Sequence, residues 1–217
     1  MDILPAQKLR QLDDRAKELG LSERLLIENA SSNLFEKVDK LSLGKKVLVV
    51  AGRGNNGADV LSCARKLYSR GYCVTVVVLE QKPLGEEAYF QKNILEKIKV
   101  PVYSISASNV RELKLFLQEC DFVLEGIVGI GVKGTLDSFL LEVINLINGA
   151  GKRIVSCDVP SGLCPQEGVS LGGAIKADYT VSFIAAKPGF FKNEGIKLCG
   201  EIFVVDIGIS KKILEDL

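Results

Sequence analysis

Apolar side chains follow two alternating patterns along this chain. Residues 5–20 and 22–40 place them at the spacing of a helix face, and Ser22 is suited to cap the second segment. From residue 47 onward, short apolar runs alternate with segments of helical spacing. The runs predict strands at 47–51, 72–79, 102–105, 122–127, 153–157, 178–185 and 201–207, and the segments between them predict helices at 57–69, 85–98, 108–119 and 135–148.

The strand runs indicate the fold class because they are continuously apolar. Segments such as 47–50 and 74–78 have no polar alternation, which is typical of strands covered on both faces. Right-handed crossovers would place helices on both sides of such a sheet. We therefore predict an α/β fold: a three-layer αβα sandwich, Rossmann-like and doubly wound, with a mostly parallel sheet. We expect one domain over residues 1–217, with two extra N-terminal helices packed on the sandwich or used in self-association.

Composition narrows the function classes. Apolar content of 47% and charged content of 25% are ordinary for a soluble globular protein. The net charge of +1 gives no general attraction to nucleic acid or anionic lipid, so we expect neither as a partner. No apolar run reaches the ~18 residues of a membrane span, and no secretory signal is visible at the N-terminus.

Cysteine and histidine usage limits the chemistry. Six scattered cysteines without a C-x-x-C pair favour a reducing, cytoplasmic setting and argue against zinc. Cys164 lies in a loop beside a candidate site, where a structural thiol is the simpler interpretation. The chain has no histidine, which excludes Ser-His-Asp and Cys-His catalysis and His-ligated metals.

The segment Gly52–Asp59 is the strongest local signal. It follows a predicted strand, opens a predicted helix and matches G-x-G-x-x-G, with Glu80 ending the next strand as in dinucleotide-binding folds. Such a turn can hold a phosphate on the free N–H groups of a helix N-terminus. The consecutive amides Asn55 and Asn56 also suit an oxygen-rich group or a cation. The simpler alternative is a tight turn without a ligand.

Further polar groups end other predicted strands. Glu125 opens a second glycine-rich loop, and a carboxylate in so apolar a run is costly unless it is paired or metal-bound. Asp158, at the end of another core strand, is a candidate general acid or base, or alternatively the cap of a local turn. Lys187 follows a further strand and could contact phosphate or assist proton transfer, although a lone lysine is usually solvated. Ligands bind at this edge of doubly wound sheets, so we expect these groups to converge.

Several motifs spread over the chain carry a resemblance to one family. They are Leu25–Ala30, Gly54–Asp59, Glu125–Gly134, Asp158–Gly162, Lys176–Val181 and Lys187–Gly189. On these motifs the chain resembles the NAD(P)HX epimerase family, also called the YjeF N-terminal domain family. The resemblance implies a Rossmann-like sandwich, usually a homodimer. It implies an isomerase that interconverts the R and S forms of hydrated NADH and NADPH, with a partner dehydratase that repairs the S form.

The resemblance also implies site residues. Asp158 and Lys187 would be catalytic, and a potassium ion would be held by Asn56, Glu125 and Ser161. The substrate-binding residues would be Asn55, Asn56, Gly57, Ala58, Asp59, Gly129, Ile130, Gly131, Val132, Lys133, Gly134, Thr135 and Asp158.

This chain departs from the family pattern at three positions. The family usually has glycine where this chain has Ala58 and Val60, and aspartate where it has Glu125. A methyl group at 58 is expected to crowd a phosphate or to forbid a positive φ. Two alternatives stay open: a non-catalytic nucleotide-binding or scaffold module of the same fold, and an NAD-dependent dehydrogenase. Also open are whether the chain is stand-alone or part of a fusion, and the preference between NADHX and NADPHX, although Glu80 would disfavour a 2′-phosphate.

Overall fold

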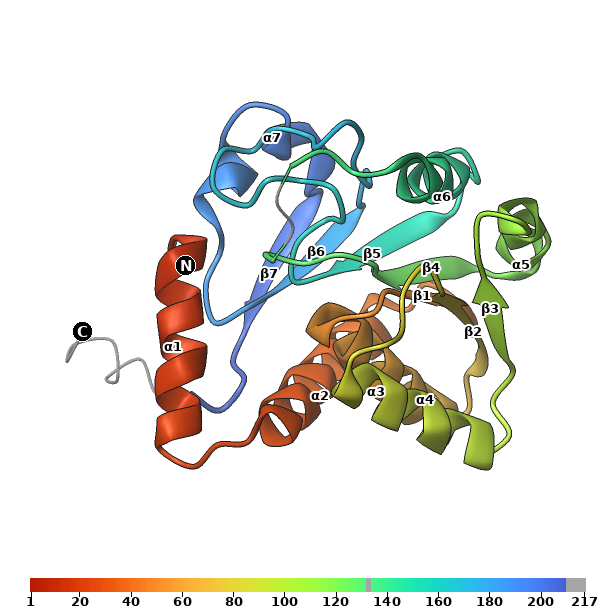
Figure 1. Ribbon diagram of the computed structural model, residues 1–217, viewed down its shortest axis with the longest axis horizontal. Helices are drawn as coiled ribbons and strands as arrows, with labels where there is room; N and C mark the ends of the chain where they lie inside the picture. Colours follow the sequence, from red (N-terminus) through yellow and green to blue (C-terminus); the bar gives the residue numbers. More distant parts are fainter. Residues whose placement is uncertain (132–133, 210–217) are drawn as a thin grey trace.

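A central sheet of seven parallel strands organises the chain in the computed structural model, which describes residues 1–131 and 134–209 (Figure 1). The strand order is β3-β2-β1-β4-β5-β6-β7, and every pairing between neighbouring strands is parallel. The strands are β1 Lys46–Ala51, β2 Cys73–Leu79, β3 Val102–Ile105, β4 Phe122–Gly126, β5 Arg153–Cys157, β6 Tyr179–Phe183 and β7 Glu201–Val205. The predicted mostly parallel sheet is therefore parallel throughout these strands.

Helices cover both faces of the sheet, as predicted. In Figure 1, α2, α3 and α4 lie below the sheet, and α5 and α6 lie on its other face. Helix α1 stands upright at the left of the view. The helices are α1 Ala6–Glu18, α2 Glu23–Leu41, α3 Asn55–Ser69, α4 Glu86–Lys97, α5 Leu113–Glu119, α6 Ser138–Asn148 and α7 Gly195–Leu198, with 3₁₀ turns η1 Val110–Glu112 and η2 Pro188–Phe191.

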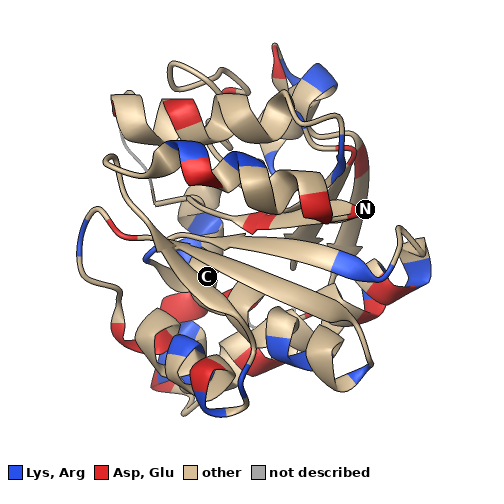
Figure 2. Ribbon diagram, turned by 90° about the vertical axis from the view of Figure 1, so that its right-hand side faces the viewer, with Lys and Arg blue, Asp and Glu red and all other residues tan. Residues whose placement is uncertain are grey.

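The apolar side chains divide between two main cores, one on each face of the sheet. Side chains of α1 to α4 pack on one face, and those of α5 and α6 pack on the other. The inner strands β1 and β4 are almost wholly buried, which explains their unbroken apolar runs. Charged residues of both signs fall mostly on the surrounding helices and loops (Figure 2). Among the described residues, no helix is both long and apolar enough to cross a membrane.

The order in which strands are added to the sheet changes direction between β1 and β4. From β1 the chain proceeds outward through β2 to β3, and it then returns to add β4 on the opposite side of β1. The segment after β1 leads to α3 on one face of the sheet, and the segment after β4 leads to α6 on the other face. Ligands of doubly wound folds bind at this switch point, so the topology places the glycine-rich turns where a site is expected.

Small differences from the predicted elements have local causes. Helix α3 begins at Asn55 rather than at residue 57, so both asparagines belong to its first turn. Helix α6 begins at Ser138 rather than at residue 135, because the Asp137 carboxylate caps it by accepting from the Leu140 N–H. All six cysteines are free.

Candidate functional site

A cavity of about 730 Å³ lies at the carboxyl ends of the strands. Its walls come from α1, α2, the first turn of α3, and the segments that follow β4, β5 and β6. Its lining residues are Leu9, Asp13, Lys17, Glu23, Leu26, Ile27, Ala30, Arg53, Gly54, Asn55, Asn56, Asp59, Lys82, Ile127, Val128, Gly129, Ile130, Gly131, Asp158, Phe183, Ile184, Lys187 and Ile207. The loops that follow β1, β4, β5 and β6 therefore converge on one cavity, as predicted.

The N-terminus of α3 opens into this cavity. Gly54 precedes the helix, and no side chain caps the first turn. The first turn of a helix carries N–H groups without intrahelical partners and the positive end of the helix dipole. Asn55 and Asn56 line the cavity beside them, and Arg53 adds positive charge. This wall is suited to bind an anionic group such as a diphosphate.

The packing of this turn requires glycine at two positions. A Cβ atom at Gly52 would lie 1.7 Å from the carbonyl oxygen of Ile127, and one at Gly57 would lie 2.0 Å from the carbonyl oxygen of Gly52. Glycine at 52 lets the β1–α3 turn contact the segment after β4, and glycine at 57 lets the first turn of α3 pack against Gly52. A Cβ at Gly54 would meet nothing within 4 Å, so that glycine leaves the cavity side of the turn open. The turn is tightly packed and also borders a cavity.

Asp158 and Lys187 form an ion pair that lines the same cavity. Asp158 follows β5 with a φ of 62°, a left-handed conformation that aspartate tolerates better than most residues. Its Oδ1 accepts from Lys187 Nζ and, at 3.0 Å, from the Phe183 N–H. The Lys187 side chain is only 1% exposed, and its Nζ also donates to Ser182 Oγ at 2.8 Å. Neither a local turn cap nor a solvated surface lysine describes these residues.

Glu125 is fully buried behind the cavity and is satisfied by hydrogen bonds. Ser156 Oγ donates to its Oε1 at 2.5 Å, and Ser161 Oγ donates to its Oε2 at 2.5 Å. The backbone N–H groups of Ser161 and Ile127 donate to it as well. Burial raises the pKa of Glu125, and these donors partly offset the rise. The pairing that such a buried carboxylate requires is therefore supplied by hydroxyl and amide donors.

The residues around Glu125 fit a hard monovalent cation. Ser161 Oγ lies 2.5 Å from Glu125 Oε2 and 3.1 Å from the carbonyl oxygen of Val128. Asn56 packs beside this segment, and its Nδ2 is buried without a hydrogen-bond partner among the described residues. Rotating that amide would place an oxygen at the same position. Carboxylate, hydroxyl, carbonyl and amide oxygens suit such a cation, whereas the described residues contain no cluster of His, Cys, Asp or Glu for a transition metal.

Two carboxylates of the cavity lining, besides Asp158, have raised pKa values, and no sequence motif points to one of them. Burial, reinforced by Asp158, raises the pKa of Asp13 to about 6. Burial also raises the pKa of Asp59 well above its ordinary value. The Gly54–Asp59 motif predicts Asp59, whereas no sequence motif points to Asp13. A signal was available: Asp13 interrupts the apolar stripe that includes Leu9, Leu12 and Ala16.

Helix α1, the first of the two predicted N-terminal helices, packs on the sandwich and forms a wall of the site. Leu9, Leu12 and Ala16 bury it in the main core. Arg10 Nη2 donates to the carbonyl oxygen of Ile130 at 2.5 Å, which ties the helix to the glycine-rich segment after β4. A backbone bridge between Ile3 and Ala186 holds the preceding residues beside Lys187.

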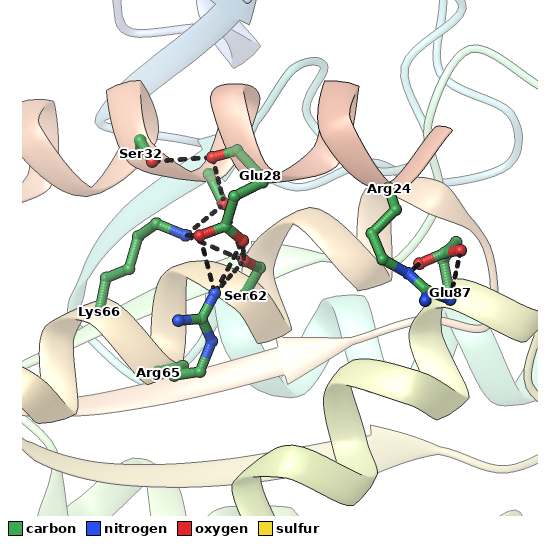
Figure 3. Close-up of polar contacts among 8 residues, drawn as sticks. Arg24, Glu28, Ser32, Ser62, Arg65, Lys66 and Glu87 are labelled. Carbon is green, nitrogen blue, oxygen red and sulfur yellow. Dashed lines mark hydrogen bonds and ion pairs between the residues drawn. The ribbon is translucent and has the colours of Figure 1, made fainter. Parts of the chain in front are cut away.

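An ion-pair cluster fixes α2, another wall of the cavity, on α3 (Figure 3). Glu28 of α2 accepts from Lys66 Nζ at 2.7 Å and from Arg65 Nη2 at 2.7 Å, and Ser62 Oγ also donates to it. Burial alone raises the pKa of Glu28, but the hydrogen bonds from Lys66 and Arg65 outweigh it and hold this pKa at about 2. The cluster lies away from the cavity lining, so it positions the wall without contributing a group to the site.

Some predicted site residues lie outside the cavity. Gly57 and Ala58 are buried inside α3, and Gly134 and Thr135 are exposed without lining the hollow. The expected crowding at Ala58 is wrong, because its methyl group is fully buried in the core and its backbone is helical. Val132 and Lys133 lie outside the described residues.

Glu80 lies apart from the main cavity. It is exposed at the end of β2 and lines a second hollow of about 490 Å³ with Lys82, Tyr89 and Lys92. Lys82 lines both hollows, which makes the two adjacent. The position of Glu80 after β2 is that of the ribose-binding carboxylate of dinucleotide folds.

Comparison with known proteins identifies the family of this αβα sandwich. Residues 23–189 match the family described as YjeF-related protein N-terminus. The chain is 32% identical over 228 residues to a protein of Elusimicrobium minutum named NAD(P)H-hydrate epimerase, with 99% of each chain covered. A protein of the same name from Cenarchaeum symbiosum is 34% identical, with 96% of each chain covered. The chain therefore belongs to the YjeF N-terminal family.

Longer relatives agree with this assignment, and a solved structure shares the fold. The chain is 36% identical to a protein of Archaeoglobus fulgidus named bifunctional NAD(P)H-hydrate repair enzyme Nnr, covering 97% of this chain and 42% of the relative. The chain thus spans about two fifths of the length of these bifunctional relatives. The crystal structure of the yeast protein YNL200c has a TM-score of 0.76 to this fold at 24% identity, covering 87% of this chain and 83% of that one.

Proposed function

We propose that this chain is an isomerase that interconverts the R and S forms of hydrated NADH and NADPH for the repair of these cofactors. One observation carries the proposal: the free N-terminus of α3 and the Asp158–Lys187 pair line one cavity in a chain of this family. The full-length epimerase relatives at 32% and 34% identity bear names that support the same activity.

Different walls of the cavity would bind different parts of a dinucleotide. The first turn of α3 would bind the diphosphate through its free N–H groups, and Arg53 at the mouth would add charge. Asp59 has no hydrogen-bond partner among the described side chains, so it is free to accept from a ribose hydroxyl. The reacting ring would lie against Phe183 and Ile184, which bring it to Asp158. We include Gly129, Ile130 and Gly131 as the opposing wall.

The reaction needs proton transfer and no redox step. The hydroxyl-bearing carbon lies beside a ring nitrogen, whose lone pair expels the hydroxyl group once it is protonated to water. Water then adds to the other face of the resulting iminium carbon and gives up a proton. The Asp158–Lys187 pair shares a hydrogen bond and is largely shielded from solvent, so it can take part in this proton transfer from its side of the ring. Histidine is not required.

We propose that potassium binds at Glu125, Ser161 and Asn56, with the Val128 carbonyl oxygen as a further ligand. When bound, the ion would supply positive charge close to the negatively charged substrate. Ser161 and Glu125 also hold the segment after β4 in place, because the Val128 N–H donates to Ser161 Oγ at 2.9 Å. The departure from aspartate to glutamate at 125 is accommodated by the pocket of donors around it.

We also propose an oligomeric state, a cellular location and a functional partner for this chain. The family resemblance supports a homodimer, and the six free cysteines support a reducing, cytoplasmic location. Relatives named as bifunctional repair enzymes support a functional partner, which we propose to be a dehydratase acting on the S form. Light scattering of the purified chain tests the dimer.

Chiral chromatography tests the activity. Purified R-hydrated NADH is incubated with the protein in buffer containing potassium, and the S form is followed over time against the spontaneous rate. Acceleration is expected from either pure epimer towards the same final ratio. A thermal-shift response to NADH or ADP-ribose without acceleration would instead favour a non-catalytic nucleotide-binding module. Hydride transfer from simple alcohols or acids, in the absence of epimerisation, would favour a dehydrogenase.

A further inference from the structure

Helix α1 brings a second carboxylate, Asp13, to the reacting end of the cavity. Leu9, Asp13 and Lys17 are spaced four residues apart, so they share one stripe of α1, and all three line the cavity. Asp158 lies in a different wall, at the end of β5. We infer that Asp13 is a second catalytic proton-transfer group, which serves the face of the substrate ring opposite to the Asp158–Lys187 pair. This inference rests on the proposed epimerase function.

The position of Asp13 is fixed by contacts on both sides of it. Arg10 holds α1 to the carbonyl oxygen of Ile130, one turn before Asp13. Lys17 Nζ, one turn after it, lies 3.4 Å from Glu23 Oε1, and Glu23 in turn accepts from Asn55 Nδ2. Both glycine-rich segments of the site are thereby linked to α1. A carboxylate between these two anchors is held at the cavity wall rather than left on a free helix.

Asp13 has the environment of a reactive group. Its side chain makes no hydrogen bond or ion pair with any described residue, although it is half-buried. The charged groups that act on it are Asp158, Lys17, Asp14 and Lys187, in addition to its own burial. Burial and the Asp158 charge raise its pKa to about 6. A carboxyl group with such a pKa can hold or release a proton near neutral pH, as a general acid or base must.

Epimerisation requires a proton-transfer group on each of the two faces of the substrate ring. Water leaves from one face of the ring and adds to the other, and a group on one face reaches only one of the two oxygens. In one direction Asp13, as the acid, protonates the leaving hydroxyl, the carbon–oxygen bond breaks, and the ring nitrogen becomes an iminium. Water then adds to the opposite face and transfers its proton to the Asp158–Lys187 pair. After this step Asp13 lacks a proton and the Asp158–Lys187 pair holds one, and proton exchange with bulk water restores both groups, so no reactant besides water is needed.

The test combines inversion with isotope exchange in Asp13→Asn, with Asp14→Asn as the matched control. Asp14 is the exposed neighbour on the same helix. Each protein is incubated with one pure epimer in ¹⁸O-water, and both the R-to-S ratio and the ¹⁸O content of each epimer are measured. Wild type and Asp14→Asn are expected to invert the carbon and to incorporate ¹⁸O. Asp13→Asn is expected to lose inversion by about 10²-fold or more.

The isotope separates this role from a structural one. Asp13→Asn should still exchange ¹⁸O, without inversion, into the epimer whose hydroxyl faces the Asp158–Lys187 pair, while Asp13→Glu should recover part of the inversion. Thermal unfolding should show Asp13→Asn to be folded. Wild-type inversion by Asp13→Asn, or equal loss of exchange and inversion in folded protein, would overturn the inference. If neither wild type nor Asp14→Asn inverts either epimer, the proposed function itself fails.

Discussion

Substituting Glu28 by glutamine tests how the ion-pair cluster in Figure 3 holds α2 on α3. The hydrogen bonds of this cluster lower the pKa of Glu28 from 4.5 to about 2, roughly 2.5 pH units. At about 1.4 kcal/mol per unit this difference corresponds to ~3.5 kcal/mol of stabilisation as an upper bound. The side chain is 43% exposed, so solvent screening reduces the figure to about 1–2 kcal/mol. The Lys66 side chain, only 14% exposed, would also be left without its partner.

The loss of stability in Glu28→Gln is expected to depend on pH. A carboxylate whose pKa is lowered by folding stabilises the protein above its unfolded pKa, and the contribution disappears as the pH falls through the folded pKa. Urea unfolding of Glu28→Gln should show the full loss at pH 7 and a progressively smaller loss between pH 4.5 and pH 2. Glu36→Gln, on the same helix with an exposed partner, serves as the control and should change stability little. A loss that is the same at pH 3 and pH 7 would refute the electrostatic reasoning.

Other predictions concern the cavity itself. Gly52→Ala should destabilise the fold by about 1–3 kcal/mol in urea unfolding because its methyl group meets a backbone carbonyl, whereas Gly54→Ala, with open space, should cost much less. Potassium should raise the thermal midpoint of wild type more than choline does, and Ser161→Ala should abolish the difference; equal responses to both salts would contradict the cation site. Asp13→Asn should stabilise the fold above pH 6 but not below pH 4, since a raised carboxylate pKa costs stability as pH rises through that range. Lys82→Ala should raise the KM for hydrated NADPH more than for hydrated NADH if the second hollow holds the adenosine; an equal change would refute that placement.

The sheet was predictable because burial on both faces leaves unbroken apolar runs. Segments such as 47–51 and 153–157 match β1 and β5 closely. The convergence of Asp158 and the α3 turn was also predictable, because parallel strands present their carboxyl ends at one edge. These inferences depend only on local pattern and on the general rules of doubly wound sheets.

The composition of the walls was not predictable to the same extent. The sequence does not state where an N-terminal helix docks, so Asp13 was missed although its place in an apolar stripe was visible. Spacing also could not tell that Ala58 faces the core, because that depends on α3 beginning at Asn55. Lys187 resembled a surface lysine in sequence, and only the fold shows that it is buried against Asp158.

The proposed function requires that the Asp158 end of the cavity interconverts the two hydrate epimers. The most direct measurement is the initial rate at which pure R-hydrated NADH yields the S form with wild type and with Asp158→Asn, both checked for folding by circular dichroism. We predict that wild type accelerates the conversion well above the spontaneous rate and that Asp158→Asn is slower by about 10²-fold or more. Equal rates for the two folded proteins, or no acceleration by wild type, would contradict the account.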